Sequence, residues 1–349
     1  MAMQPYFSST SRPWLSILVP AYNAEQFVGE CIESALRQSE ECHIEIIVVD
    51  DCSTDGTAEI VDRLQSDHPG LLVLERSTVN LGVSATRNRL LDLASGEYVW
   101  FLDSDDRMRP GAVASLKHIV ASHAPDLVLC DFSVWRESYT KRQLKKGEMH
   151  RTGFSGTARK LLTDKSDLME GLYRAGQFHF WSKIFRRSLW TEDLKFPEGR
   201  HFEDVALSPV IALRAATYYY EPAPWIDYRQ SPASILATMR PGKYVELMRA
   251  LAEVDECMQQ YPETLSDNVW FEFRACCGRH FIGCVKDQLR MPSNESRSAA
   301  IQACHSFLKA IVRDDLWLAR QSLLRGMPGK WIRLKKWEWR AKRAIRRLA

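Results

Sequence analysis

The sequence predicts an α/β fold with a doubly wound, mostly parallel sheet, followed by a C-terminal helical extension. In the first third of the chain, short apolar runs alternate with amphipathic helical patterns, and the runs are almost continuously apolar. Such strands are buried on both faces, as in parallel sheets covered by helices. Carboxylate residues also follow two of these runs directly. They mark the carboxyl ends of the strands, where parallel sheets bind their ligands.

The expected elements can be placed in chain order. The first strand covers residues 15–19, and Asn23 can cap a helix with a buried face over residues 27–36. Further strands at residues 44–49, 71–74, 98–102 and 127–129 alternate with helices near residues 60–64, 85–93 and 112–122. Residues 136–156 read as a long surface loop, and residues 161–229 as mixed helices and short strands. Helices are expected from residue 244, over residues 270–285 and over residues 299–324.

Length and composition indicate more than one compact unit. A chain of 349 residues, 45% hydrophobic, can bury a full core. We expect an N-terminal tail at residues 1–13, a main domain at 14–237 with halves at 14–132 and 160–237, a helical region at 238–326 and a basic tail at 327–349. No signal-peptide pattern or run of roughly 18 apolar residues is seen. The nine scattered cysteines never form Cys-x-x-Cys. A cytoplasmic location, without zinc or disulfides, is therefore expected.

Three carboxylates crowd into one turn after the strand at residues 98–102, namely Asp103, Asp105 and Asp106. Like charges within about 4–6 Å raise one another's pKa, and a hard divalent ion with oxygen ligands relieves the repulsion. Mg²⁺ or Mn²⁺ would also bridge the oxygens of a diphosphate leaving group. The alternative is a solvated acidic turn that caps the next helix. This motif alone favours neither interpretation.

Two further loops point to the same edge of the predicted sheet. Asp51, in residues 50–56 (DDCSTDG), could accept a base N–H or hold ribose hydroxyls, or the segment could be a turn in which Ser53 or Thr54 caps a helix. Residues 80–88 (NLGVSATRN) open a helix, and Arg87 lies one turn later. Helix N-termini and Arg favour anionic oxygens, although Arg87 could also be an ordinary surface residue. Rossmann and Walker A glycine motifs are absent from the sequence.

Taken together, residues 19–23 (VPAYN), 49–56 (VDDCSTDG), 80–88 (NLGVSATRN) and 101–106 (FLDSDD) resemble the family 2 glycosyltransferases of the GT-A fold. The resemblance implies a GT-A-like fold and a nucleotide-sugar donor, with UDP favoured by family frequency. It implies a DxD motif and a Mn²⁺ or Mg²⁺ ion held by Asp105 or Asp106. The residues that it assigns to donor binding are Pro20, Tyr22, Asp51, Arg87, Asp103 and Asp105.

The resemblance extends over residues 13–237, through residues 180–187 (FWSKIFRR), 196–204 (FPEGRHFED), 228–229 and 234–235. It implies that Asp204 is the general base, with Glu203 the lesser candidate. It also implies that Trp181, Lys183 and His201 lie near the acceptor and diphosphate. The acidic pair could instead cap a helix that begins near Val205.

Two departures from the family pattern bear on the reaction. Cys52 stands where the family commonly has Gly, which changes the turn slightly. The Gln-x-x-Arg-Trp motif and membrane spans of processive synthases are both absent from the sequence. The resemblance therefore implies inverting transfer of one sugar to a glycan or lipid-linked glycan of the cell surface.

The last twenty residues carry most of the basic character. They contain nine Lys or Arg and one Glu, a local charge of +8, which leaves −5 for the rest of a chain whose net charge is +3. A helix here would bury Leu334, Trp337, Ile345 and Leu348 on one side, which suits the surface of an anionic bilayer. Nucleic-acid contact or a solvated helix is the alternative for the tail, and whole-chain nucleic-acid binding is not expected.

Two other functions remain open at this level. A sugar-nucleotide pyrophosphorylase can share a similar sheet, but it should carry a Gly-rich, basic loop after the first strand, where this chain has residues 20–23 (PAYN). A catalytically inactive nucleotide-sugar-binding scaffold at the membrane is the second alternative. The intact acidic motifs argue against it.

Overall fold

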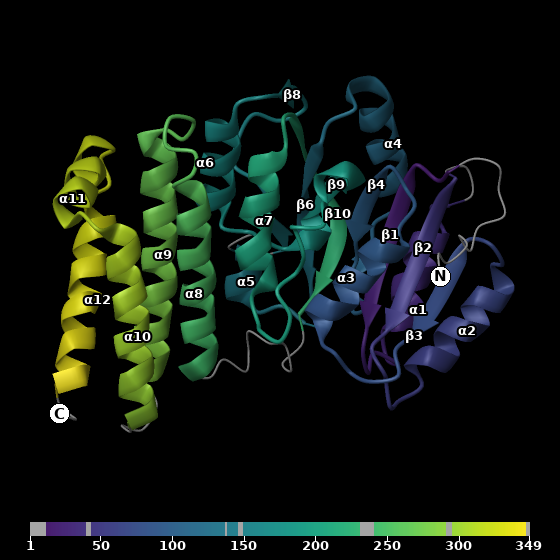
Figure 1. Ribbon diagram of the computed structural model, residues 1–349, viewed down its shortest axis with the longest axis horizontal. Coiled ribbons are helices and arrows are strands. Elements are labelled where there is room, and N and C mark those ends of the chain that lie inside the picture. Colours follow the sequence, from purple (N-terminus) through teal and green to yellow (C-terminus); the bar gives the residue numbers. More distant parts are fainter. Residues whose placement is uncertain are drawn as a thin grey trace. The chain divides into compact units, whose positions relative to one another are not determined.

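The computed structural model describes residues 12–39, 43–136, 138–145, 149–230, 241–290 and 295–346. The chain forms two compact units (Figure 1). Unit 1 comprises Met1–Thr163, Gln177–Arg200 and Ile211–Ser231, and unit 2 comprises Asp164–Gly176, His201–Val210 and Pro232–Ala349. Unit 1 carries the sheet, and unit 2 carries the C-terminal helices.

The sheet of unit 1 has the strand order β3-β2-β1-β4-β9-β6-β10-β5. Neighbours pair in parallel from β3 to β4 and between β6 and β10, whereas β9 is antiparallel to both β4 and β6. Short strands β5, β7 and β8 add antiparallel pairs at β10 and β6. The predicted α/β fold with a mostly parallel sheet is therefore confirmed. The strands are β1 (Leu15–Ala21), β2 (Ile44–Asp50), β3 (Leu72–Arg76), β4 (Tyr98–Phe101), β5 (Arg107–Met108), β6 (Leu127–Trp135), β7 (His150–Arg151), β8 (Leu161–Leu162), β9 (Lys183–Arg186) and β10 (Tyr218–Arg229).

The strands nearest the N-terminus form the centre of the core. Every residue of β1 and β2 is buried, which explains why both segments are apolar without alternation. Helix α3 contacts β1 and β2, and α2 contacts β3. The helices of this unit are α1 (Val28–Leu36), α2 (Thr57–Asp67), α3 (Val83–Leu93), α4 (Ala112–His123) and α5 (Lys141–Lys145), with single turns at Phe180–Ser182 and Arg187–Leu189.

Two predicted helix caps are wrong, for the same reason. Helix α1 begins after Phe27, and α2 begins after Gly56, neither with a side-chain cap. Asn23 instead accepts a hydrogen bond from the Thr54 backbone N–H, and the Ser53 hydroxyl accepts one from the Asn23 backbone N–H. These polar side chains join the two loops to each other, so they are not available to the helices.

The C-terminal helices form a bundle in unit 2. They are α8 (Pro241–Met258), α9 (Asp267–Gln288), α10 (Glu295–Val312), α11 (Asp315–Leu324) and α12 (Pro328–Arg346). Helix α6 (Lys165–Ala175) packs against α9, while α7 (Glu203–Arg214) runs from unit 2 into unit 1. The helix expected over residues 299–324 is broken at Arg313, whose φ is 51°. Asp314 then caps α11 by accepting from the N–H groups of Leu316 and Trp317.

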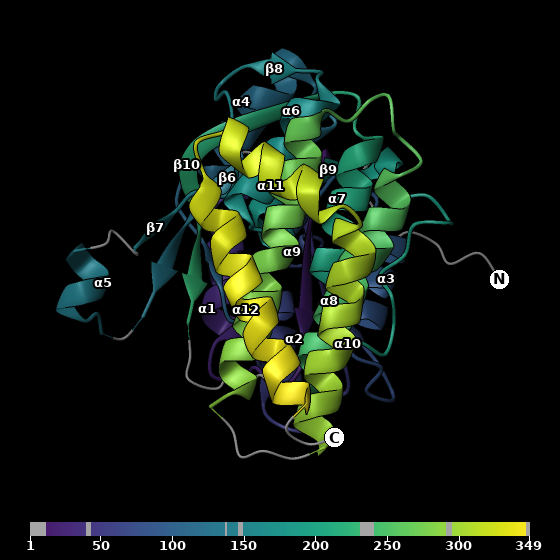
Figure 2. The ribbon, with the colours of Figure 1, turned by 90° about the vertical axis from the view of Figure 1, so that its left-hand side faces the viewer.

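The predicted amphipathic tail forms α12, which lies along α9 and α10 and also contacts α11 (Figure 2). Leu334, Ala341 and Ala344 are buried in these contacts, whereas Trp337 and Ile345 are half-buried. Leu348, also predicted on the buried side, lies outside the described residues, as do residues 234–235. The apolar side of α12 therefore packs against the other helices of the bundle.

Among the described residues, no helix has both the length and the apolar character that a bilayer-spanning segment needs.

Candidate functional site

The carboxyl ends of β1, β2 and β4 meet at one edge of the sheet. Ala21 pairs with Asp50 in the β1–β2 register, and the Leu102 backbone N–H donates to Leu18 at the end of the β1–β4 pair. The β1–α1, β2–α2 and β4–β5 loops therefore start side by side. They carry the predicted donor-binding residues.

The β1–α1 and β2–α2 loops are joined by reciprocal hydrogen bonds. Besides the bonds of Asn23, the Glu25 backbone N–H donates to Asp55, and the Gly56 backbone N–H donates to the Glu25 carboxylate at 2.8 Å. Tyr22 stands at the start of this joined pair with 51% of its surface exposed. Its ring is therefore free to meet a ligand. Pro20, in contrast, is buried within β1.

Asp51 fixes the loop that opens α3. Its two carboxylate oxygens accept the backbone N–H groups of Leu81 at 2.9 Å and Gly82 at 2.8 Å, and its carbonyl accepts from the Asn80 amide at 3.0 Å. Gly82 has a φ of 87°, a conformation that suits glycine alone. Asp51 is only 3% exposed, so the geometry gives it a positioning role. Its predicted contact with the nucleobase stays a prediction.

Arg87 links α3 to the acidic turn. Its guanidinium Nη2 lies 2.8 Å from Asp103 Oδ1 and also packs near the rings of Phe101 and Phe196. Arg87 is 5% exposed, so the alternative of an ordinary surface residue is wrong. The structure thus joins two of the predicted donor residues in one ion pair.

The acidic turn is electrostatically strained in the way that its sequence suggests. Burial, followed by the charge of Asp103, raises the pKa of Asp105 from 3.8 to about 6. Burial and the two neighbouring carboxylates also raise the pKa of Asp106. Asp106 Oδ1 accepts the Arg229 backbone N–H at 2.8 Å, and its Oδ2 has no hydrogen-bond partner among the described residues. A cation would relieve this crowding.

A network that the sequence did not predict supports the turn. Arg229 donates from Nε to the Asp105 carbonyl at 2.8 Å and from Nη2 to Glu30 at 2.7 Å. Arg107 then bridges Glu30 and Asp227, each at 2.8 Å. The partners lie up to 199 residues apart, and no local pattern in the sequence signals such pairs. The network holds the acidic turn between α1 and β10.

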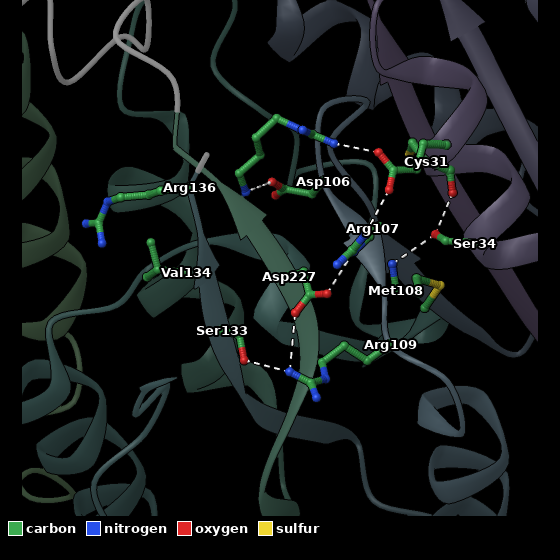
Figure 3. Close-up of polar contacts among 12 residues, drawn as sticks. Cys31, Ser34, Asp106, Arg107, Met108, Arg109, Ser133, Val134, Arg136 and Asp227 are labelled. Carbon is green, nitrogen blue, oxygen red and sulfur yellow. Dashed lines mark hydrogen bonds and ion pairs between the residues drawn. The ribbon is translucent and has the colours of Figure 1, made fainter. Parts of the chain in front are cut away.

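A cavity of about 680 Å³ lies beside this network in unit 1. Figure 3 shows one side of it, where Arg109 donates to Ser133 at 2.8 Å and pairs with Asp227 at 3.3 Å. Arg37 and Arg107 also line it, and Asp227 is its one acidic lining residue among those described. Three Arg and one Asp therefore line the cavity, and two of these Arg also pair outside it, Arg37 with Glu33 and Arg107 with Glu30.

The predicted acceptor-side residues fall into two groups. Trp181 is 2% exposed and stacks on His179, with ring centroids 4.7 Å apart. Lys183 is fully buried, and its ammonium donates to the carbonyls of Gln177 and His179, each at 2.9 Å. Direct ligand contact by Lys183 is therefore ruled out in this conformation. Lys183 holds the turn at Phe180–Ser182, and its expected place near the acceptor and diphosphate, like that of Trp181, stays a prediction.

The second group lies in unit 2. His201 is exposed, and its backbone N–H donates to Glu246 at 2.8 Å. Glu203 and Asp204 form the first turn of α7, where Asp204 Oδ1 accepts the Val205 backbone N–H. That position agrees with the helix-end alternative but does not exclude a base. The role of Asp204 stays a prediction because the donor-side carboxylates belong to the other unit.

The residues at the acidic turn fit a metal ion only in part. Among the described residues, no group of three or more His, Cys, Asp or Glu side chains is arranged to hold one. Asp103 and Asp105 would supply two carboxylates, and the remaining ligands would have to come from the substrate. Mg²⁺ is commonly bound in this way, by one or two carboxylates with substrate phosphates.

Comparisons with known proteins agree with this geometry. The model of the family described as glycosyl transferase family 2 matches residues 16–187. The uncharacterized glycosyltransferase YibD of Escherichia coli K12 is 26% identical over 278 residues, which cover 75% of this chain and 78% of YibD. The uncharacterized glycosyltransferase EpsJ of Bacillus subtilis is 32% identical over 204 residues, which cover 54% of this chain and 55% of EpsJ.

Solved structures show the same fold. The structure of residues 1–349 of Staphylococcus aureus TarS in complex with UDP-GlcNAc has a TM-score of 0.71 and 20% identity, and it covers 95% of this chain and 89% of that one. The sheet, its acidic edge and the sequence match therefore converge: residues 16–187 belong to glycosyl transferase family 2, and the protein is a glycosyltransferase with a GT-A-like fold.

Proposed function

We propose that the protein transfers one sugar, with inversion, from a nucleotide-sugar donor to a hydroxyl of a glycan or lipid-linked glycan. The observation that carries the proposal is the chain of contacts from Asp51 through the start of α3 to Arg87, Asp103 and Asp105. It gathers hydrogen-bond donors, a guanidinium and carboxylates at one sheet edge. The family assignment leaves the pyrophosphorylase alternative without support.

A nucleoside diphosphate is the donor class that suits this edge, and UDP is our first choice. Tyr22 offers an exposed ring for stacking on a base, while Asp51 holds the Leu81–Gly82 backbone in place. TarS of S. aureus has been solved with UDP-GlcNAc and with UDP. A mannosyltransferase of Pyrobaculum calidifontis, with a TM-score of 0.52, has been solved with GDP-Man and Mn²⁺.

A divalent ion, Mn²⁺ or Mg²⁺, would be held by Asp105 with help from Asp103. When bound, the ion neutralises charge on the departing diphosphate. Asp105 suits this role because its carboxylate oxygens are not used in the hydrogen bonds that tie the turn to Arg229. Asp106 was predicted as an alternative ligand, but its side chain is 2% exposed and is held by the Arg229 backbone. We therefore assign Asp106 to the support of the turn.

The acceptor hydroxyl needs a base within hydrogen-bond reach. We propose Asp204 for this role, with Glu203 as the lesser candidate. A single displacement with the base opposite the leaving diphosphate inverts the anomeric centre. Both residues belong to the first turn of α7, where the helix N-terminus stabilises a carboxylate.

The arginine-lined cavity beside the acidic turn indicates which acceptors fit. Arg37, Arg107 and Arg109 line it, and the Arg fork is well suited to phosphate or carboxylate. Two relatives are described as poly(ribitol-phosphate) glycosyltransferases, one of Bacillus spizizenii and one of S. aureus. We infer that the acceptor carries an anionic group, such as a phosphodiester, close to the hydroxyl that is glycosylated.

We also propose that the protein works at an anionic membrane surface on the cytoplasmic side. The side of α12 that faces away from the bundle exposes Lys336, Lys342 and Arg343, together with Trp339, which is 59% exposed. Cations interleaved with an exposed indole suit the interface of an anionic bilayer. This contact would bring the enzyme to a lipid-linked acceptor.

A panel of nucleotide sugars tests the proposal. Thermal unfolding is measured with UDP-, GDP- and CMP-sugars, each with Mn²⁺ and with EDTA, and release of the free nucleotide is measured in parallel. One class of nucleotide sugar should stabilise the protein only with metal and should be consumed. Stabilisation without any consumption in the presence of candidate acceptors would favour the inactive scaffold. Equal stabilisation with EDTA would contradict the metal assignment.

A further inference from the structure

Unit 2 contains a groove of about 390 Å³ between α9, α11 and α12, separate from every residue assigned above to the donor. Its floor is apolar and includes Phe271, Ile282, Leu318 and Leu334. Two glycines of α9 widen it. At one of them, Gly283, an added Cβ would meet no atom within 4 Å. The volume lies within the roughly 300–1,000 Å³ typical of ligand sites.

The rim of the groove is cationic. Arg279, Lys286, Lys330 and Arg333 line it, and no Asp or Glu does so among the described residues. The nearby Glu272 pairs with Lys330 at 3.4 Å and offsets one of these charges, which leaves Arg279, Lys286 and Arg333. A ligand that entered the groove would therefore meet excess positive charge above an apolar surface.

Two buried polar groups in the same groove lack partners. Ser322 is 1% exposed, and neither its hydroxyl nor the Trp331 indole N–H has a hydrogen-bond partner among the described residues. Both side chains line the groove. Buried donors of this kind are normally satisfied, so they point to a ligand with oxygen acceptors.

We infer that this groove binds an anionic amphiphile: one hydrocarbon chain lies on the apolar floor, and a phosphate group lies at the cationic rim. The source is a phospholipid of the anionic bilayer. The inference deepens the membrane contact proposed for α12, because it adds a site for a single lipid on the bundle side of that helix. It does not depend on the donor site.

Calorimetry with dodecyl phosphate below its micellar concentration tests the groove. The wild type should bind dodecyl phosphate. Inorganic phosphate alone should give no measurable heat, because it lacks the hydrocarbon chain that binds the apolar floor. Gly283→Leu fills the groove and should weaken binding at least tenfold. Gly242→Leu is the matched control, because Gly242 is also an open helical glycine but lies in α8 and does not line the groove. It should bind as the wild type does.

The charge requirement is tested at Lys286, which is half-buried, and at Arg333, which is exposed. Lys286→Gln/Arg333→Gln should weaken dodecyl phosphate binding roughly twenty-five-fold, since each cation near an anionic group is worth about fivefold. Lys336→Gln/Lys342→Gln makes the same charge change on residues that do not line the groove, and it should leave this binding unchanged.

Vesicles of phosphatidylglycerol identify the source. The Gly283→Leu variant should lose affinity for these vesicles, and no variant should bind phosphatidylcholine. Three results would each overturn the inference: no binding of dodecyl phosphate, equal binding by the two Gly variants, or inorganic phosphate binding as tightly as dodecyl phosphate. Vesicle binding that is lost only in the Lys336/Lys342 variant would leave the outer side of α12 as the membrane contact and would also reject the groove.

Discussion

Replacing Asp105 with Asn should change stability and donor binding in opposite directions. The pKa of Asp105 is raised from 3.8 to about 6 by burial and by Asp103, so the folded protein disfavours the ionised carboxylate. A shift of about two pKa units corresponds to at most about 3 kcal/mol at neutral pH. The amide keeps the size of the side chain and removes the charge. The Asp105 backbone carbonyl still accepts from Arg229.

The sign of the pH dependence follows from the raised pKa. The stability that protonated Asp105 contributes is fully present below pH 3.8 and is lost as the pH rises through about 6. Asp105→Asn should therefore be more stable than the wild type by about 1–3 kcal/mol at pH 7.5, and the difference should disappear near pH 4. Urea unfolding without metal or nucleotide measures this. Asp67→Asn, at an exposed position at the end of α2, is the control and should show neither effect.

The second half of the assay adds Mn²⁺ and UDP. At a hundred times its dissociation constant, a ligand stabilises the wild type by about 2.7 kcal/mol, and the Asn variant should gain much less because it lacks the metal-binding charge. If Asp105→Asn is less stable than the wild type at pH 7.5, the argument from the raised pKa is refuted. If the variant still gains the full increase in stability with Mn²⁺ and UDP, the assignment of Asp105 as a metal ligand is refuted as well.

Three further variants test the remaining assignments. Asp204→Asn should lower turnover by about two to four orders of magnitude with donor affinity unchanged; near-normal turnover, measured by nucleotide release, would transfer the base to Glu203. Arg109→Gln should raise the KM for a phosphate-bearing acceptor about tenfold and leave the KM for the donor unchanged, and an equal effect on a neutral acceptor would reject the anion contact. Lys336→Gln/Lys342→Gln should reduce cosedimentation with phosphatidylglycerol vesicles at low salt about tenfold, whereas full retention would remove the outer side of α12 as a membrane contact.

The architecture of the sheet edge was accessible from the sequence because its signals are local. Residues 44–49 form an unbroken β-branched and apolar run, and the carboxylates follow at once, so the strand and its ligand edge are predicted together. Arg87 was singled out by its place one turn into the predicted helix, and the resemblance assigned it to donor binding. Its burial against Phe101 and Phe196 depends on a segment more than one hundred residues away, which no periodicity of α3 reveals.

The sequence could not show which distant groups bind the same side chains in the folded protein. Asn is a residue type that often caps helices, but the side-chain oxygen of Asn23 accepts a hydrogen bond from the Thr54 backbone N–H instead. Lys183 was expected near a ligand, yet backbone carbonyls on its own turn surround its ammonium. The apolar side of the tail was expected at a bilayer surface, whereas Leu334 and Ala341 pack inside the bundle. In each case a tertiary contact decides the role of a side chain whose type suggests another.

The joined β1–α1 and β2–α2 loops have a consequence for redesign of donor specificity. Bonds run in both directions between them, from Asn23 and Glu25 on one loop to Ser53, Asp55 and Gly56 on the other. A loop grafted singly from a relative with another nucleotide preference would leave several of its partners unmatched. The two loops therefore behave as one exchangeable cassette, and a chimera should fold and change its base preference only when both are transplanted together.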